Sequence, residues 1–123
     1  LMINEMSMSG GDFFPWIFRQ QQAGPLIGKR SWGGLVKSSV HYSLVDGGAL
    51  TAPDNAIFDP LNNRWVAENE GITPDIDVYQ DAQSLNNGEE PQLEAAVAET
   101  LRLLEEQGEM DIQPPLFSTP AAN

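Results

Sequence analysis

The sequence contains no cysteine and only one histidine, and these two shortages exclude several kinds of chemistry. Without cysteine there can be no disulfide, no thiolate nucleophile and no cysteine-ligated zinc. A single histidine, His41, cannot form a multi-histidine metal site within the chain. Basic residues are also scarce, since 6 Lys and Arg stand against 18 Asp and Glu and the formal net charge is −12. Because no basic face could displace phosphate counterions, we expect no nucleic-acid partner.

Long apolar runs are missing as well. No stretch approaches the roughly 20 apolar residues that span a bilayer, so we expect no membrane span in this chain. The first residues lack the charged-then-apolar pattern of a signal peptide. A strand-like apolar run begins at Leu1, which is not an initiator methionine, and we therefore expect a fragment or a processed product. The compartment, cytoplasmic or periplasmic, stays open because a targeting region would lie upstream.

The 123 residues, 41% of them hydrophobic, suit one small domain with a modest core. Apolar periodicity and turn residues predict a mixed α/β domain over residues 1–108 and an extended proline-rich tail over 109–123. Residues 36–45 alternate as a half-buried strand does, and residues 81–90 are typical of a polar linker. The other predicted elements are strands at 1–3, 25–28, 49–52 and 76–78, two short strands within 55–66, and helices at 12–22 and 91–107.

Two features qualify the predicted helices. Pro15 is tolerable only if the first helix begins at about Gly11 or Asp12, where the amides lack partners anyway. From residue 66 to residue 111 there are 13 acids and one base, Arg102. A solvated acidic helix face explains most of this imbalance, and a docking surface for a basic partner is the alternative.

Ser9 is the first candidate for chemistry. It lies between a predicted strand and a predicted helix and is followed by two glycines, so its hydroxyl would project from a tight turn. Free amides at the helix start could bind an oxyanion, and Gly10 allows close approach of a substrate because it has no Cβ. Local features alone favour a plainer role, in which Ser9 or Ser7 caps the helix. The usual Gly-x-Ser-x-Gly elbow is absent.

The other candidates are weaker. His41 is the one possible imidazole base, but a strand side chain facing solvent or a partner is the favoured interpretation. Helix-start or turn chemistry accounts for Asp12, Asp46 and Asp54. Glu68 lies in a structured-looking loop, although on its own it is only an exposed acid.

Several segments, in this order along the chain, together resemble the tricorn-type serine proteases. The resemblance covers nearly the whole chain and rests on the ordered set rather than on one motif. The segments are NEMSMSGGDFFP at 4–15, LIGKRSWGG at 26–34, LVDG at 44–47, ENEGITPDI at 68–76, PQL at 91–93 and PP at 114–115.

The resemblance implies roles for particular residues. Ser9 would be the nucleophile of peptide hydrolysis through an acyl-enzyme, and the Gly10 amide one of two oxyanion-hole donors. Glu68 would belong to a relay that orients the catalytic histidine through a second serine, and Gly33 and Gly34 would contact substrate. In this family the histidine, the second serine and the other donor lie upstream of the nucleophile strand, and His41 matches none of them.

The resemblance also implies a fold and partners. The fold would be the α/β spiral of crotonase-like and Clp-protease-like proteins, of which this chain supplies the second half. The partners would be a peptide substrate, the upstream half of the same protein and other copies in a homo-oligomer. No cofactor and no metal are implied.

Two positions depart from the family pattern. Tricorn-type enzymes commonly carry an acidic residue directly after the nucleophile, where this chain has Gly10, so a side-chain role there is in doubt. The related carboxyl-terminal processing peptidases have a lysine where this chain has Gly34, which disfavours a Ser-Lys dyad. Lys29 and Lys37 flank that turn and are expected on the surface.

Two alternatives to a peptidase stay open. The chain could be a non-catalytic binding or assembly module whose glycine-rich edge at 32–34 takes a peptide by strand addition. It could also be a structural fragment without independent activity. A Ser-His pair in the upstream sequence would favour the peptidase.

Overall fold

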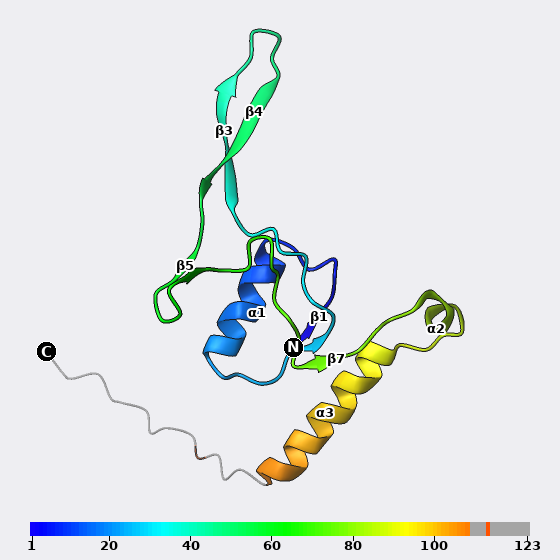
Figure 1. Cartoon of the computed structure of the whole chain (residues 1–123). Helices are drawn as coiled ribbons and strands as arrows, with labels where there is room; N and C mark the ends of the chain where they lie inside the picture. The colour runs from blue at the N-terminus through cyan, green and yellow to red at the C-terminus, as the bar shows by residue number, and fades with distance from the viewer. Residues whose placement is uncertain (109–112, 114–123) are drawn as a thin grey trace, which may run out of the picture.

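A parallel sheet of three very short strands organises the chain in this computed structural model (Figure 1). Strand β1 (Met2–Ile3) pairs with β2 (Ile27–Gly28), and β2 pairs with β7 (Ile76–Asp77). Helix α1 (Gly10–Gln20) connects β1 to β2. The structure describes residues 1–108 and 113, so the predicted tail at 109–123 lies outside the described residues apart from Gln113. Parallel strands joined through a helix confirm the α/β class.

Helix α1 begins at Gly10, slightly earlier than predicted. Pro15 therefore lies inside the helix, in its second turn, and not in the first turn where a missing N–H is harmless. The side chain of Pro15 is buried, so the position gains packing where the helix loses one hydrogen bond. Residues 21–26 lead from the end of the helix into β2.

Two antiparallel hairpins follow β2. Strands β3 (Lys37–Ser43) and β4 (Ala49–Asn55) form a ribbon that projects from the rest of the molecule (Figure 1). Strands β5 (Phe58–Asp59) and β6 (Arg64–Trp65) form a smaller pair. The strands of both hairpins were predicted, with β4 longer than the expected 49–52, but the expected half-burial of β3 is wrong. Its apolar residues Val40 and Tyr42 are more than 60% exposed, because no second layer of structure from the described part of the chain covers either face of the ribbon.

The last part of the described chain is helical. Helix α3 (Pro91–Gln107) and its stop at Gly108 match the prediction. Residues 81–90 are not simply a linker, because they contain the short helix α2 (Ala82–Asn86). The Asp81 carboxylate caps α2 by accepting hydrogen bonds from the backbone N–H groups of Gln83 and Ser84, both at 2.9 Å.

The hydrophobic core is small. Its buried members come from β1, the start of β2 and the loops at either end of the hairpins: Ile3, Leu26, Leu35, Val66, Ala67 and Ile72. Aromatic side chains of α1 pack against this cluster. By contrast, the apolar stripe of α3 is open, with Leu93, Val97, Leu101 and Leu104 between 45% and 57% exposed. Within the described residues, no helix is long and apolar enough to cross a membrane.

Candidate active site

Ser9 occupies a strained turn between β1 and α1. It is the N-cap residue of the helix, with φ 54° and ψ −107°. A positive φ is uncommon for a residue with a side chain and costs on the order of 1–3 kcal/mol. Ser9 is exposed, so its hydroxyl is accessible to solvent. An exposed serine hydroxyl on a strained strand-to-helix turn is also the arrangement of the nucleophile in α/β-hydrolases, although the glycine pattern here is different.

Ser9 also takes part in helix capping, so the two interpretations made from the sequence coexist. Ser9 and Asp12 form a capping box, and the Ser9 N–H donates to Asp12 Oδ2 at 2.8 Å. The Ser9 hydroxyl approaches the Asp12 N–H without making a full capping hydrogen bond. That N–H instead donates to the Ser9 carbonyl oxygen at 2.9 Å. The hydroxyl is therefore not required to hold the helix start.

Gly10, the first residue of α1, has an N–H that is unpaired within the described part of the chain and open space beside it. Its N–H has no partner among the described residues, as is normal for the first amides of a helix. A Cβ built at Gly10 would meet nothing within 4 Å, so the space beside it is open. The helix dipole favours negative charge at this end. An oxygen atom carrying developing charge could therefore approach the Gly10 amide.

Asp12 joins the Ser9 turn to the loop at 31–34. Its side chain is fully buried, and each of its two carboxylate oxygens accepts two hydrogen bonds. Oδ1 accepts from Ser31 Oγ at 2.6 Å and from the Gly33 N–H at 2.8 Å. Oδ2 accepts from the Ser9 N–H and, at 3.2 Å, from the Gly34 N–H. From the sequence, Asp12 was assigned only a role at the start of the helix. Its position three residues after Ser9, which is the spacing of a capping box, was the one available sign that the two residues interact.

The loop at 31–34 holds the Ser9 turn through the backbone as well. The Ser9 N–H also donates to the Gly34 carbonyl at 3.1 Å, and the Trp32 N–H donates to the Ser7 carbonyl at 2.8 Å. On its other side the loop meets the segment after Val66, where the Asn69 N–H donates to the Gly33 carbonyl at 2.8 Å. Gly33 thus lies between the Ser9 turn and the Glu68 loop.

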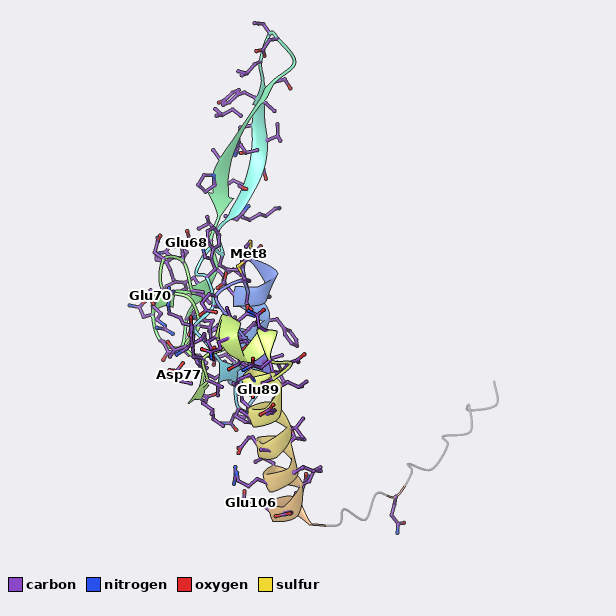
Figure 2. All side chains as sticks on the ribbon, turned by 90° about the vertical axis from the view of Figure 1, so that its right-hand side faces the viewer. Met8, Glu68, Glu70, Asp77, Glu89 and Glu106 are labelled. Atoms are coloured by element: carbon purple, nitrogen blue, oxygen red, sulfur yellow. The ribbon has the colours of Figure 1, made fainter. Side chains whose placement is uncertain are left out.

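Glu68 is half-buried and is more than the exposed loop acid that local sequence indicates. Its Oε2 accepts hydrogen bonds from the N–H groups of Leu35 and Val36, at 2.7 and 2.8 Å. Its other oxygen, Oε1, has no hydrogen-bond partner among the described residues. Since Gly34 binds the Ser9 turn and Leu35 binds Glu68, two consecutive residues connect the two candidates. Figure 2 shows Glu68 and Met8, which precedes Ser9, at the same level below the β3–β4 ribbon.

His41 is not part of this cluster. It lies on the projecting β3 strand, it is exposed, and its Nε2 is 3.3 Å from the Ala52 carbonyl oxygen. Lys29 pairs with Asp77 at 2.6 Å, and Lys37 is exposed, as expected for both lysines. The described residues include no group of three or more His, Asp or Glu side chains that could hold a metal ion.

The groups with displaced pKa values lie outside this cluster, in β4, at the β5–β6 turn, at the start of α2 and along α3. The side chain of Asn62 donates to Asp59 and lowers the pKa of that carboxyl group. The Ser84 hydroxyl has the same effect on the pKa of Asp81, helped by the backbone amides at the start of α2. These carboxylates are fixed by local capping, so they give no sign of acid–base chemistry.

The structure thus links a strained, exposed serine beside a free helix-start amide to a tethered glutamate through the consecutive residues Gly34 and Leu35. In comparison with known families, residues 1–78 match the model of Peptidase family S41, and the chain belongs to that family.

Its relatives within the family are tricorn proteases. The chain is 40% identical over 103 residues to tricorn protease homolog 1 of Streptomyces coelicolor, covering 84% of this chain and 10% of that protein. It is 36% identical over 102 residues to the tricorn protease of Thermoplasma volcanium, covering 83% and 10%. A crystal structure of the tricorn protease matches with a TM-score of 0.77 and 31% identity, over 85% of this chain and 10% of that one. These matches confirm the resemblance, and the chain spans about a tenth of the length of these relatives.

Proposed function

We propose that this chain is the carboxyl-terminal part of a tricorn-type serine peptidase catalytic domain, with Ser9 as its nucleophile. The observation that carries the proposal is the turn at Ser9, which exposes a hydroxyl in a strained backbone directly before a free helix-start amide. Membership of Peptidase family S41 supports the same reaction class. The substrate would be a peptide, cleaved in two steps through an ester on Ser9.

In the first step, Ser9 Oγ attacks the carbonyl carbon of the scissile peptide bond while a base takes its proton. The carbonyl oxygen becomes an oxyanion, which the Gly10 N–H would stabilise, and the open space beside Gly10 supports this role. The intermediate then collapses, the amine leaves with a proton returned by the base, and an acyl-Ser9 ester remains. Water hydrolyses this ester by the same path, which releases the acid and restores the hydroxyl.

The base would come from a part of the protein outside this chain, because His41 lies exposed on the projecting ribbon. Glu68 would orient that base through an intervening group. Its Oε2 is anchored on two backbone amides, which leaves Oε1 available to accept a hydrogen bond from the relay. A carboxylate fixed at one oxygen and open at the other suits an orienting role.

The remainder of the catalytic domain would cover surfaces that are open here. The outer edges of β1 and β7 have no partner strand in the described residues, and parallel sheets are normally larger and covered on both faces. The apolar stripe of α3 is exposed along its length. We infer that these surfaces join the upstream half, in the crotonase-like or Clp-protease-like spiral fold, and that further copies assemble into a homo-oligomer.

Strand addition at Gly33 and Gly34, the alternative function, has less support. Both N–H groups already donate to Asp12, and each carbonyl already accepts one hydrogen bond. An added strand would find no free donor at these two residues. Substrate could contact them only through a second hydrogen bond to a carbonyl.

The experiment that tests the proposal compares two serine variants of the parent polypeptide in peptide hydrolysis. Ser9→Ala should reduce the rate to background, whereas Ser7→Ala should keep most of it. Ser7 is the matched control, because it lies in the same turn and its hydroxyl bonds only to Asn4. Loss of activity in Ser7→Ala with full activity in Ser9→Ala would refute the assignment.

A further inference from the structure

We propose that Asp12 is a positioning residue that holds the Ser9 backbone in its reactive conformation and fixes it to the loop at 31–34. The inference rests on the proposed function of Ser9, which it deepens by naming the group that keeps the nucleophile in place. The hydrogen bonds of Asp12 described above are the starting observation.

The Asp12 carboxylate is buried without a counterion. Its side chain is 0% exposed, and none of the ion pairs in residues 1–108 includes it. A buried charge is costly unless hydrogen bonds compensate it. Four donors do so here, and the amino end of α1 adds a favourable dipole. The four donors therefore occupy both oxygens of Asp12, although the proposed acyl transfer does not use this residue.

The two oxygens divide their partners in a way that couples separate segments. Oδ2 receives the Ser9 and Gly34 N–H groups, so one atom ties the nucleophile to the neighbouring loop. Oδ1 receives the Gly33 N–H and the Ser31 hydroxyl. Ser31 Oγ in turn accepts from the Ile72 N–H at 2.7 Å, which extends the network to the segment after Glu68. The rigid carboxylate thus sets the spacing of three chain segments.

The Ser9 turn needs such a hold because its backbone is strained. A residue with φ 54° and ψ −107° relaxes toward a common conformation unless its surroundings prevent it. The bond from the Ser9 N–H to Asp12 is charge-assisted and 2.8 Å long, so it is the strongest restraint on that residue. Relaxation would rotate the Ser9 hydroxyl and the following Gly10 amide together, and both would leave the geometry of the reaction.

Asparagine cannot replace this aspartate. The side-chain amide has one acceptor oxygen, and its NH2 group would face N–H donors on the opposite side. With the NH2 toward Ser9 and Gly34, the turn loses its restraint. With the NH2 toward Gly33 and Ser31, the loop at 31–34 loses its own. The first orientation removes the support of the nucleophile directly, and the second weakens the loop that carries Gly34.

The test measures covalent labelling of Ser9 by a fluorophosphonate in the parent polypeptide, with rate and final extent recorded separately. Asp12→Asn should lower the labelling rate constant of the folded protein at least tenfold, while the fraction labelled at completion stays near that of wild type. A purely structural role would reduce the labelled fraction and leave the rate constant of the folded molecules unchanged. Backbone hydrogen exchange at Ser9 and Gly34 should accelerate in the same variant.

Asp75→Asn is the matched control. Asp75 is also a carboxylate that fixes a backbone amide, accepting from the Leu26 N–H at 2.7 Å, but its partners lie in the sheet and in α1. We expect this variant to lose stability with an unchanged labelling rate constant. Equal rate constants for wild type and Asp12→Asn, with unchanged exchange at Ser9, would overturn the proposal. If Asp12→Asn fails to fold, hydrogen exchange in Ser31→Ala decides. That variant removes only a donor to Oδ1, so the Ser9 and Gly34 N–H groups, which donate to Oδ2, should still exchange slowly. Fast exchange at both would contradict the role of Oδ2. An unlabelled wild-type Ser9 would instead refute the proposed function, and with it any role of Asp12 in the reaction.

Discussion

Replacing Gly33 with alanine tests whether the loop at 31–34 really joins the Ser9 turn to the Glu68 loop. Gly33 has φ +91°, and a Cβ there would lie 2.7 Å from the Gly71 nitrogen and 3.2 Å from the Ala67 carbonyl oxygen. Both atoms belong to the backbone, so neither can move aside without displacing the loop. Gly47 is the matched control, because its φ is +86° and a Cβ there would meet nothing within 4 Å.

The two variants share the cost of an unfavourable φ, about 1–2 kcal/mol, and the small gain from restricting the unfolded chain. Only Gly33→Ala adds the steric cost of an overpacked site, about 1–3 kcal/mol. Urea unfolding of both variants should therefore show a larger loss of unfolding free energy for Gly33→Ala, by roughly 1–3 kcal/mol at an unchanged m-value. Equal losses would refute the close approach of Gly33 to the loop at 67–71.

Three further predictions follow from the site and from the helix caps. Glu68→Gln should lower turnover by less than the ~10⁶-fold that loss of a triad nucleophile can cost, and the unfolding free energy should change little. Glu68→Ala should in addition lose about 1–3 kcal/mol of stability, because it leaves two amides without an acceptor. Turnover in Glu68→Gln equal to wild type would contradict the relay. The isolated 123 residues should hydrolyse peptides no faster than buffer, and His41→Ala should make no difference. Addition of the upstream half should restore activity. Robust hydrolysis that His41→Ala abolishes would contradict this prediction. Finally, hydrogen bonds from Ser84 and Gln83 lower the pKa of Asp81. The cap of α2 is therefore intact above the ordinary pKa of an aspartate and is lost as the pH falls through the lowered value. Asp81→Asn should keep the cap and remove this pH dependence from the Gln83 and Ser84 amide signals.

The sequence predicted the helices and strands whose signals lie within the element itself, such as an apolar period or a residue that begins or ends it. Helix α3 has an apolar period, a proline at its start and a glycine at its end, and both its limits were predicted. Strand β3 was predicted for the same reason, from the alternation of residues 36–45. Helix α2 was missed because five residues are too few to show a period, and only its Asp81 cap marked it.

Burial and the site network could not be predicted in this way. Alternation in β3 shows which side chains share a face, but it cannot show whether another layer of structure covers that face. Ser9 and Glu68 became the leading candidates only through the ordered resemblance, since each has an ordinary local explanation. Asp12 was undervalued because its partners at Ser31, Gly33 and Gly34 lie about twenty positions away in the sequence. Contacts of that separation depend on the tertiary fold.

The central claim is that Ser9 forms a covalent bond to the acyl group of the substrate. Mass-spectrometric mapping of the parent polypeptide after fluorophosphonate treatment tests it most directly. We predict one modified peptide spanning the end of β1 and the start of α1, with the adduct on Ser9 and no adduct in Ser9→Ala. An adduct on Ser7, on Ser31 or on another serine, with Ser9 unmodified in an active preparation, would contradict the assignment.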